Sequence, residues 1–293
     1  FILGIYLIKN SYKIIFRKNF LMNSIEEKFV KKDNIGLKII VACALSLFLE
    51  LSIIRIHSSY IHFFSFLKNI SLISCFLGLG IGYSLRRFKL ISLNWIFPLL
   101  FLQIVMIYFL SNTPVSTALL NPILERMTMG QDTAETFIHL ILIYLFIIFI
   151  FIFNALCFVP IGHLISRLMN NVNNLRAYGF NLLGSLLGII VFIIFSFLQT
   201  SPLVWIIFSF LTFLYLIRFD IRKYYLSILS ILILTIILSL DIKNKNNTIY
   251  SPYQNITIEH LNNPLNPVII KTSHFFYQAV LNLSNNLSNL TDN

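Results

Sequence analysis

The chain has 293 residues, of which 57% are hydrophobic and only 11% are charged. Soluble globular domains carry about 25% charged residues, so this balance excludes an ordinary soluble protein. The formal net charge is +11. The basic residues gather beside apolar runs, which is the pattern of membrane topology and not of a nucleic-acid-binding surface. We therefore expect an integral membrane protein whose surroundings are the lipid bilayer, with no nucleic-acid partner.

The apolar runs predict an all-α multi-span bundle of about seven transmembrane helices. Crossing about 30 Å of hydrocarbon takes roughly 20 apolar residues, and several runs reach that length. A helix of a soluble protein would keep one polar face, whereas these runs are apolar all round. The predicted spans are residues 37–56, 70–85, 91–111, 137–159, 180–198, 203–217 and 225–240.

The first span contains two ionisable residues, Glu50 and Arg55. Such groups are costly at membrane depth and usually pair or line a polar cavity. A spacing of five residues separates them by about 140° on an ideal helix, so they are not expected to pair with each other. We expect each to meet a partner on another helix, or Arg55 to extend to the membrane surface. A structural role and a substrate or proton site are both open for the two residues.

Glycines mark the second and fifth spans. Gly78, Gly80 and Gly82 resemble a dinucleotide-binding turn in spacing, but no strand–turn–helix unit surrounds them. Gly184 and Gly188 are four residues apart. Both sets predict close helix packing, because small residues let helix backbones approach.

The loops between the spans alternate in charge. Basic residues gather in the N-terminal segment and at 86–89, 167–176 and 218–223, whereas the intervening loops hold almost only Lys68 and Arg126. The positive-inside rule then predicts a cytoplasmic N terminus and puts the residues after the seventh span on the opposite side. We expect the inner (plasma) membrane of a bacterium.

The end of the chain has a different composition. Residues 255–259, 268–271 and 275–283 predict short strands around an Asn-Pro turn region. We expect a basic cytoplasmic segment at 1–36, a transmembrane domain at 37–240 and a soluble tail at 241–293 with a short β-hairpin segment. A few strands alone are not stable, so the tail is expected to be the incomplete start of a domain.

No complete active site is predicted. No glycine follows Gly188, so the tail has no glycine-rich cofactor loop, and its few carboxylates suggest no acid–base pair. We predict no catalytic residue, no metal site and no bound cofactor within the chain. The cysteines lie in apolar spans without metal-ligand spacing: Cys43, Cys75 and Cys157.

Two sets of residues carry a resemblance to a known family. Ser251-Pro-Tyr-Gln254, the strands that follow it, and Phe276-Tyr-Gln278 resemble the N-terminal β-region of spermidine synthases. Upstream, three features resemble the multi-span domain of membrane-bound spermidine synthase-like proteins. They are Glu50 with Arg55, Lys68-Asn69 followed by Phe76-Leu-Gly-Leu-Gly-Ile-Gly82, and Ala177-Tyr178 followed by Asn181-Leu-Leu-Gly-Ser185 and Pro202.

The resemblance extends from about residue 37 to residue 283. It implies a polyamine aminopropyltransferase-like activity, with decarboxylated S-adenosylmethionine as co-substrate and a polyamine as partner. It also implies that Gln254 and Gln278 help to bind the donor, and that a Rossmann-like domain with the catalytic residues follows residue 293. At Thr272-Ser-His274 the chain departs from the family's Asp-Gly.

Two other functions are open. Glu50 and Arg55, with the glycine-lined helices, also suggest a multi-span transporter or permease-like protein for a small polar or cationic solute. A membrane anchor without chemistry is a third reading. The predicted sidedness bears on the choice, because it places the tail away from a cytosolic nucleotide donor.

Overall fold

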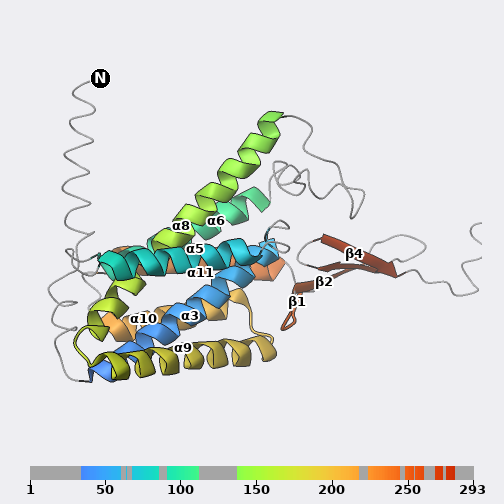
Figure 1. The fold of residues 1–293 in the computed structure, drawn as a ribbon. Helices are drawn as coiled ribbons and strands as arrows, with labels where there is room; N and C mark the ends of the chain where they lie inside the picture. The colour runs from blue at the N-terminus through green and yellow to red at the C-terminus, as the bar shows by residue number, and fades with distance from the viewer. Residues whose placement is uncertain are drawn as a thin grey trace, which may run out of the picture.

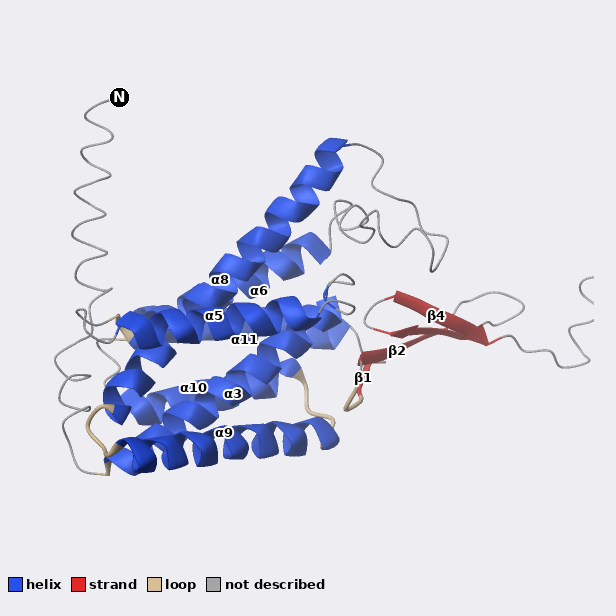
Figure 2. Ribbon diagram, in the orientation of Figure 1, coloured by secondary structure: helices blue, strands red, loops and turns tan. Residues whose placement is uncertain are grey.

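The computed structural model describes residues 34–60, 64, 68–85, 91–111, 137–217, 224–244, 248–253, 255–260, 268–272 and 275–280. This part of the chain forms a bundle of seven α-helices and a small antiparallel sheet (Figures 1 and 2). The helices are α3 (Ile35–Tyr60), α5 (Lys68–Ser84), α6 (Ile96–Ser111), α8 (Phe137–Met169), α9 (Asn174–Phe197), α10 (Pro202–Ile217) and α11 (Tyr225–Asn244).

Each predicted span coincides with one of these helices. Three of the helical stretches described are long and apolar enough to cross a membrane: Ile35–Tyr60, Tyr144–Met169 and Asn174–Phe197. The stretches Leu93–Tyr108, Pro202–Ile217 and Tyr225–Leu240 are apolar but shorter. The helical fold and its membrane character are therefore supported, and the count of seven spans stays a prediction.

One predicted helix end is wrong. The fourth span was expected to end before Pro160, but α8 continues through Pro160 to Met169. Proline removes a backbone donor and usually breaks a helix in water. Within a packed membrane bundle it is tolerated, because neighbouring helices satisfy the groups that it frees.

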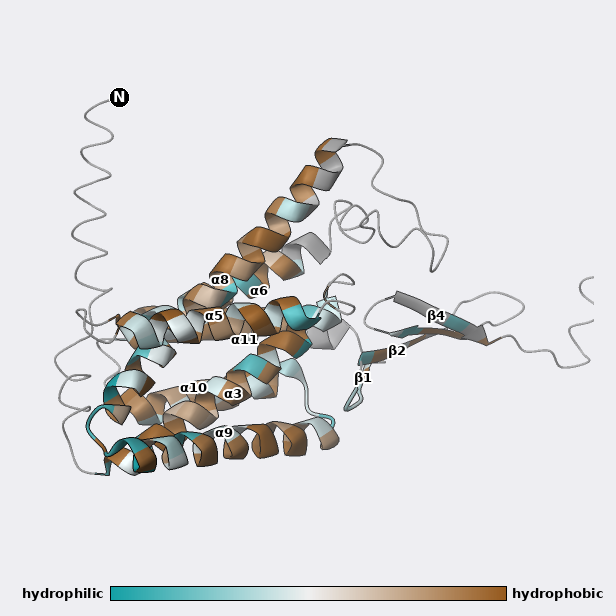
Figure 3. Cartoon of the chain, viewed as in Figure 1, coloured by the Kyte–Doolittle hydropathy of each residue, from teal (hydrophilic) through white to brown (hydrophobic). Residues whose placement is uncertain are grey.

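The helix α3 lies at the centre of the bundle. Its main neighbour is α9, and it also packs against α10, α8, α5 and α6. The other extensive pair is α5 with α8. Figure 3 shows that hydrophobic residues predominate along the helices, and large apolar side chains along α9 such as Leu182 and Leu186 are exposed. This outward apolar surface suits contact with lipid.

Glycines bring α5 and α8 into backbone contact. A Cβ added to Gly78 would collide with the carbonyl oxygen of Ala155, and one added to Gly82 would lie 2.6 Å from the backbone nitrogen of His163. A Cβ on Gly80 would meet nothing within 4 Å. The prediction of close packing is thus confirmed for Gly78 and Gly82 but not for Gly80.

The second glycine pair joins α9 to α3. A Cβ on Gly184 would collide with the Ile40 carbonyl oxygen, and one on Gly188 would lie 3.0 Å from the Cα of Ala44. The packing role predicted for this pair is confirmed. The contacts pair Gly184 with Ile40 and Gly188 with Ala44. Because the residue numbers increase in the same direction on both helices, α3 and α9 run parallel.

The tail forms a four-stranded antiparallel sheet in the order β1-β2-β3-β4, which is larger than the predicted hairpin. The strand β1 was missed because three residues are too few to show a period of two. The register of β3 and β4 shifts between Ile270 and Lys271. The strands are β1 (Thr248–Tyr250), β2 (Asn255–His260), β3 (Val268–Thr272) and β4 (Phe275–Val280).

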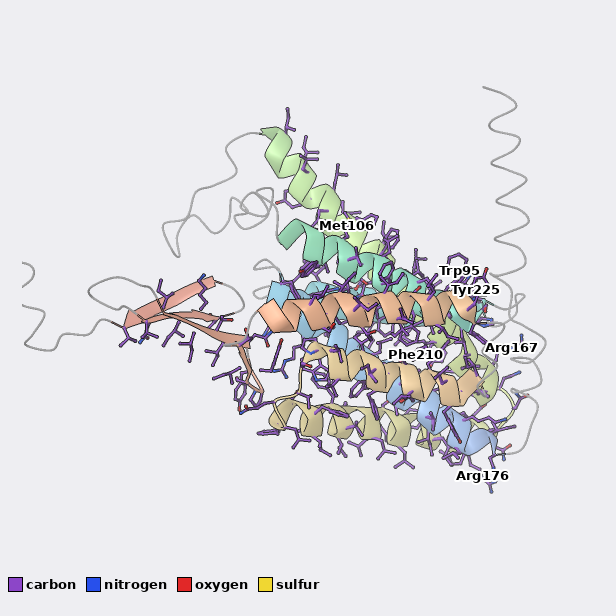
Figure 4. All side chains as sticks on the ribbon, turned by 180° about the vertical axis from the view of Figure 1, so that it is seen from behind. Trp95, Met106, Arg167, Arg176, Phe210 and Tyr225 are labelled. Atoms are coloured by element: carbon purple, nitrogen blue, oxygen red, sulfur yellow. The ribbon has the colours of Figure 1, made fainter. Side chains whose placement is uncertain are left out.

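The two ends of the bundle differ. Figure 4 shows the sheet beyond one end and the labelled Arg167, Arg176, Trp95 and Tyr225 near the other. Tryptophan and tyrosine concentrate at membrane surfaces, and arginine concentrates on the cytoplasmic side. The sheet lies at the end of the bundle opposite to Arg167 and Arg176.

Candidate functional site

Arg55 lies where the bundle meets the sheet. Its side chain is only 9% exposed. Nη1 donates to the hydroxyl of Ser196 on α9 at 2.7 Å, and Nη2 donates to the backbone carbonyl of Ser251, just after β1. The guanidinium carbon also lies 4.8 Å from the ring centroid of Trp205. Arg55 thus ties α3 to α9, to α10 and to the start of the tail.

The turn between α9 and α10 holds the Trp205 ring in place. The indole Nε1 donates to the hydroxyl of Thr200 at 2.8 Å, and that hydroxyl donates to the carbonyl of Phe195 at 2.8 Å. Gln199, in the same turn, has φ of 52°, which is uncommon for a residue other than glycine. A specific turn therefore presents the face of the ring to the Arg55 cation.

Glu50 lies elsewhere on α3 and does not pair with Arg55. Its side chain is 1% exposed, and its Oε2 has no hydrogen-bond partner among the described residues. One turn earlier, the buried hydroxyl of Ser46 also lacks a partner in this part of the chain. The expectation that Glu50 and Arg55 are too far apart around the helix to pair is confirmed. Within the described ranges, the partner expected on another helix is found for Arg55, at Ser196, and not for Glu50.

A chain of polar side chains crosses the interior beside Glu50. His57 on α3 has its Nδ1 at 2.8 Å from the hydroxyl of Ser71 on α5. The side-chain amide of Gln103 on α6 lies 2.9 Å from Nε2 of the same ring. Because an NH₂ group can only donate, Nε2 accepts and Nδ1 carries the proton in the neutral ring. These contacts join three helices through buried groups.

Asn154 on α8 continues this polar chain. Its Nδ2 lies 3.1 Å from the Ser71 carbonyl, 2.5 Å from the Ser74 hydroxyl and 3.2 Å from the Cys75 sulfur. Its Oδ1 has no hydrogen-bond partner among the residues that the structure describes. Asn154 thus connects α8 to three groups of α5, which also carries the hydroxyl contacted by His57.

Sequence reasoning found the charged members of this interior and missed the neutral ones. The signal was present, because Gln103 and Asn154 are single amides within long apolar runs. Isolated polar groups at membrane depth tend to have a partner on another helix. Which helix supplies the partner depends on the packing, which the runs do not encode.

Of the two predicted donor-binding residues, the structure describes Gln278. Gln254 lies outside the described residues, and Gln278 is an exposed residue of β4 paired with Ile270 of β3. In the described ranges no group of three or more His, Cys, Asp or Glu side chains is placed to hold a metal ion. The polar interior of the bundle is therefore the candidate site with the most complete geometry.

Comparison with known proteins adds no relative. No protein-family model, curated protein or solved structure matches the chain. The resemblance to spermidine synthase-like proteins therefore rests on the motifs described above.

Proposed function

We propose that this chain is the integral membrane domain of a spermidine synthase-like protein, followed by the first strands of its synthase domain. The order of elements carries the proposal. The last helix of an apolar bundle, α11, leads within a few residues into an antiparallel sheet that contains the Ser251-Pro-Tyr motif. A β-region that starts with this motif is what the resemblance implies.

In this proposal the family activity is aminopropyl transfer from decarboxylated S-adenosylmethionine to a polyamine. Gln254 and Gln278 would contribute to donor binding, and the glycine-rich loop and catalytic carboxylates would belong to the rest of the synthase domain. The described residues contribute a structural contact and not a catalytic group. Arg55 binds the carbonyl of Ser251 and so fixes the start of the sheet to the membrane domain.

The sidedness of the sheet tests this proposal. A cytosolic donor can reach the synthase domain only if the sheet is in the cytoplasm. The sheet lies at the end of the bundle away from Arg167 and Arg176, and basic loops usually face the cytoplasm (Figure 4). The transferase proposal and the positive-inside rule therefore make opposite predictions for one residue near Ser251.

A single cysteine can decide between them. Tyr253 is 83% exposed, so Tyr253→Cys in a background with all three native cysteines replaced by alanine can be probed on intact cells with a membrane-impermeant thiol reagent. Leu175→Cys and Leu198→Cys are matched controls, because these residues are 85% and 67% exposed near opposite ends of α9. Protection of Tyr253→Cys supports the transferase, and labelling rejects transfer from a cytosolic donor.

A transporter for a small cationic solute is the second candidate function. The observation that favours it is the buried carboxylate of Glu50, which lies among the helices with one oxygen unpartnered. Uptake of radiolabelled putrescine and spermidine by cells that produce the chain would be compared with uptake by the Glu50→Gln variant. Uptake that is unchanged in the variant would argue against transport through this site.

A further inference from the structure

Among the described residues, four side-chain oxygens of the polar interior lack hydrogen-bond partners. Three belong to α3 and α8, namely Ser46 Oγ, Glu50 Oε2 and Asn154 Oδ1, and the fourth is Gln103 Oε1 on α6. Their side chains are almost completely buried. Buried polar atoms in proteins nearly always have a partner, because leaving one unpaired is costly. A ligand that binds the three oxygens on α3 and α8 would offset the free-energy cost of leaving them without partners.

The backbone places two of these oxygens together. Ser46 and Glu50 are four residues apart on α3, so their side chains lie one above the other on the same face of the helix. Asn154 belongs to α8, which packs against α3. Its amide nitrogen lies 3.1 Å from the Ser71 carbonyl oxygen and 3.2 Å from the Cys75 sulfur, both on α5. His57, seven residues after Glu50 and on the same face of α3, contacts the hydroxyl of Ser71. This face of α3 and Asn154 of α8 therefore both pack against the same part of α5.

The orientation of the Asn154 amide is determined by its surroundings. Its nitrogen lies 3.1 Å from the carbonyl oxygen of Ser71, which can only accept a hydrogen bond. The amide must therefore present its NH₂ group to α5, and its oxygen points away from α5. An exchange of the two amide atoms would put two acceptors against each other, so the free Oδ1 follows from the chemistry of the contact.

The charge of Glu50 has no counter-ion among its basic neighbours on α3. Arg55 is about 140° away around the helix and bonds Ser196 and Ser251. The His57 ring uses its two nitrogens for Ser71 and Gln103. A buried carboxyl group either is protonated or has a compensating positive charge beside it. One carboxylate with two neutral oxygens compensates one positive charge and not two.

We propose that Ser46, Glu50 and Asn154 form a binding site for a small monovalent cation of the size of Na⁺ between α3 and α8. Oxygen ligands suit a hard cation, and the nearly complete burial of the site favours a compact ion over an extended polyamine. The site goes beyond aminopropyl transfer, and its presence does not depend on either function proposed above.

The test measures thermal unfolding of the full chain in detergent. Choline chloride is replaced stepwise by NaCl at constant ionic strength, with KCl and NH₄Cl as parallel series. A ligand that binds only the folded state raises the unfolding midpoint, here by an expected few degrees, on the order of 2–4 °C. The same midpoint in choline and in all three salts would overturn the proposal.

Variants locate the ion. Glu50→Gln should abolish the salt-specific rise, and Ser46→Ala should weaken the apparent affinity by about tenfold, as expected for one lost contact to a charge. Ser52→Ala is the matched control, because the buried Ser52 hydroxyl bonds the carbonyl of Phe48 at 2.7 Å and has no part in the site. A rise that persists in Glu50→Gln would overturn the assignment.

Direct binding of ²²Na⁺ to the purified protein gives a second readout. One ion per chain is expected for wild type and for Ser52→Ala, and none for Glu50→Gln. If wild type binds no ion and its midpoint is insensitive to salt, Glu50 is protonated and the proposal fails. This result would leave the sidedness test of the transferase unaffected, so the two proposals fail independently.

Discussion

The helix α3 carries two buried charges whose surroundings differ. Arg55 faces α9 and α10 and has a serine hydroxyl, a backbone carbonyl and the face of an indole ring around its cation. Glu50 lies about 140° away around the helix, and its Oε2 has no hydrogen-bond partner among the described residues. A long planar cation can reach several neutral acceptors at a bundle end, whereas a short carboxylate in the interior depends on what the facing helices supply. Arg55 therefore holds helices and the start of the tail together, whereas Glu50 is the charged group that a ligand could bind.

The largest expected effect comes from disrupting the close packing of α5 against α8. Gly78→Ala places a methyl group against the Ala155 carbonyl and should destabilise the protein by about 3 kcal/mol, because backbone cannot move aside cheaply. The thermal midpoint in detergent checks this. Gly80→Ala is the control, since its Cβ meets nothing within 4 Å and should leave stability unchanged or slightly higher. Equal effects of the two variants would contradict the proposed α5–α8 packing.

The next effect concerns the Arg55 side. Arg55→Gln removes the contacts with Ser196, Ser251 and Trp205 and should cost about 2–3 kcal/mol, as for hydrogen bonds to a charged group. Limited proteolysis should cut the tail after β1 faster while the bundle stays resistant. Arg55→Lys keeps the charge but loses the planar fork, so an intermediate result is expected. If the tail of Arg55→Gln resists proteolysis as well as that of the wild type, the contacts of Arg55 do not hold the tail in place.

A smaller effect is expected at Asn154. Asn154→Ala removes the amide that bonds α5 at the Ser71 carbonyl and the Ser74 hydroxyl, and should lower stability by about 1–2 kcal/mol. Ser209→Ala is the control, because that buried hydroxyl bonds only within its own helix, at the Trp205 carbonyl. The thermal midpoint should fall clearly more for Asn154→Ala. A larger loss for Ser209→Ala would contradict the role of the amide as a contact between helices.

The smallest effect has the opposite sign. In choline chloride, without a small cation, Glu50→Gln should stabilise the protein by about 1 kcal/mol, because it removes a buried charge that no side chain of the described residues compensates. The same change of a charged residue to glutamine therefore lowers the thermal midpoint at Arg55 and raises it at Glu50. A clear loss of stability in Glu50→Gln under these conditions would mean that the carboxylate already has a partner.

Much of the helical fold could be predicted from the sequence. The seven apolar runs coincide with helices because an uninterrupted apolar run of helical length is a local property of the chain. The separation of Glu50 from Arg55 followed from helix geometry alone. The end predicted before Pro160 was wrong, because the surrounding helices outweigh the local preference of proline. The tail was predicted as strands, but β1 is too short to leave a pattern.

The sequence by itself determined which segments are helical, which of them are apolar all round, and where small residues allow helices to touch. Only the tertiary structure decided which side chains meet. The partners of Arg55 lie 141 and 196 residues away along the chain, and Asn154 bonds groups about 80 residues away. Helix formation depends on neighbours within a few residues, whereas the contacts of a buried charge depend on which faces of distant helices pack together.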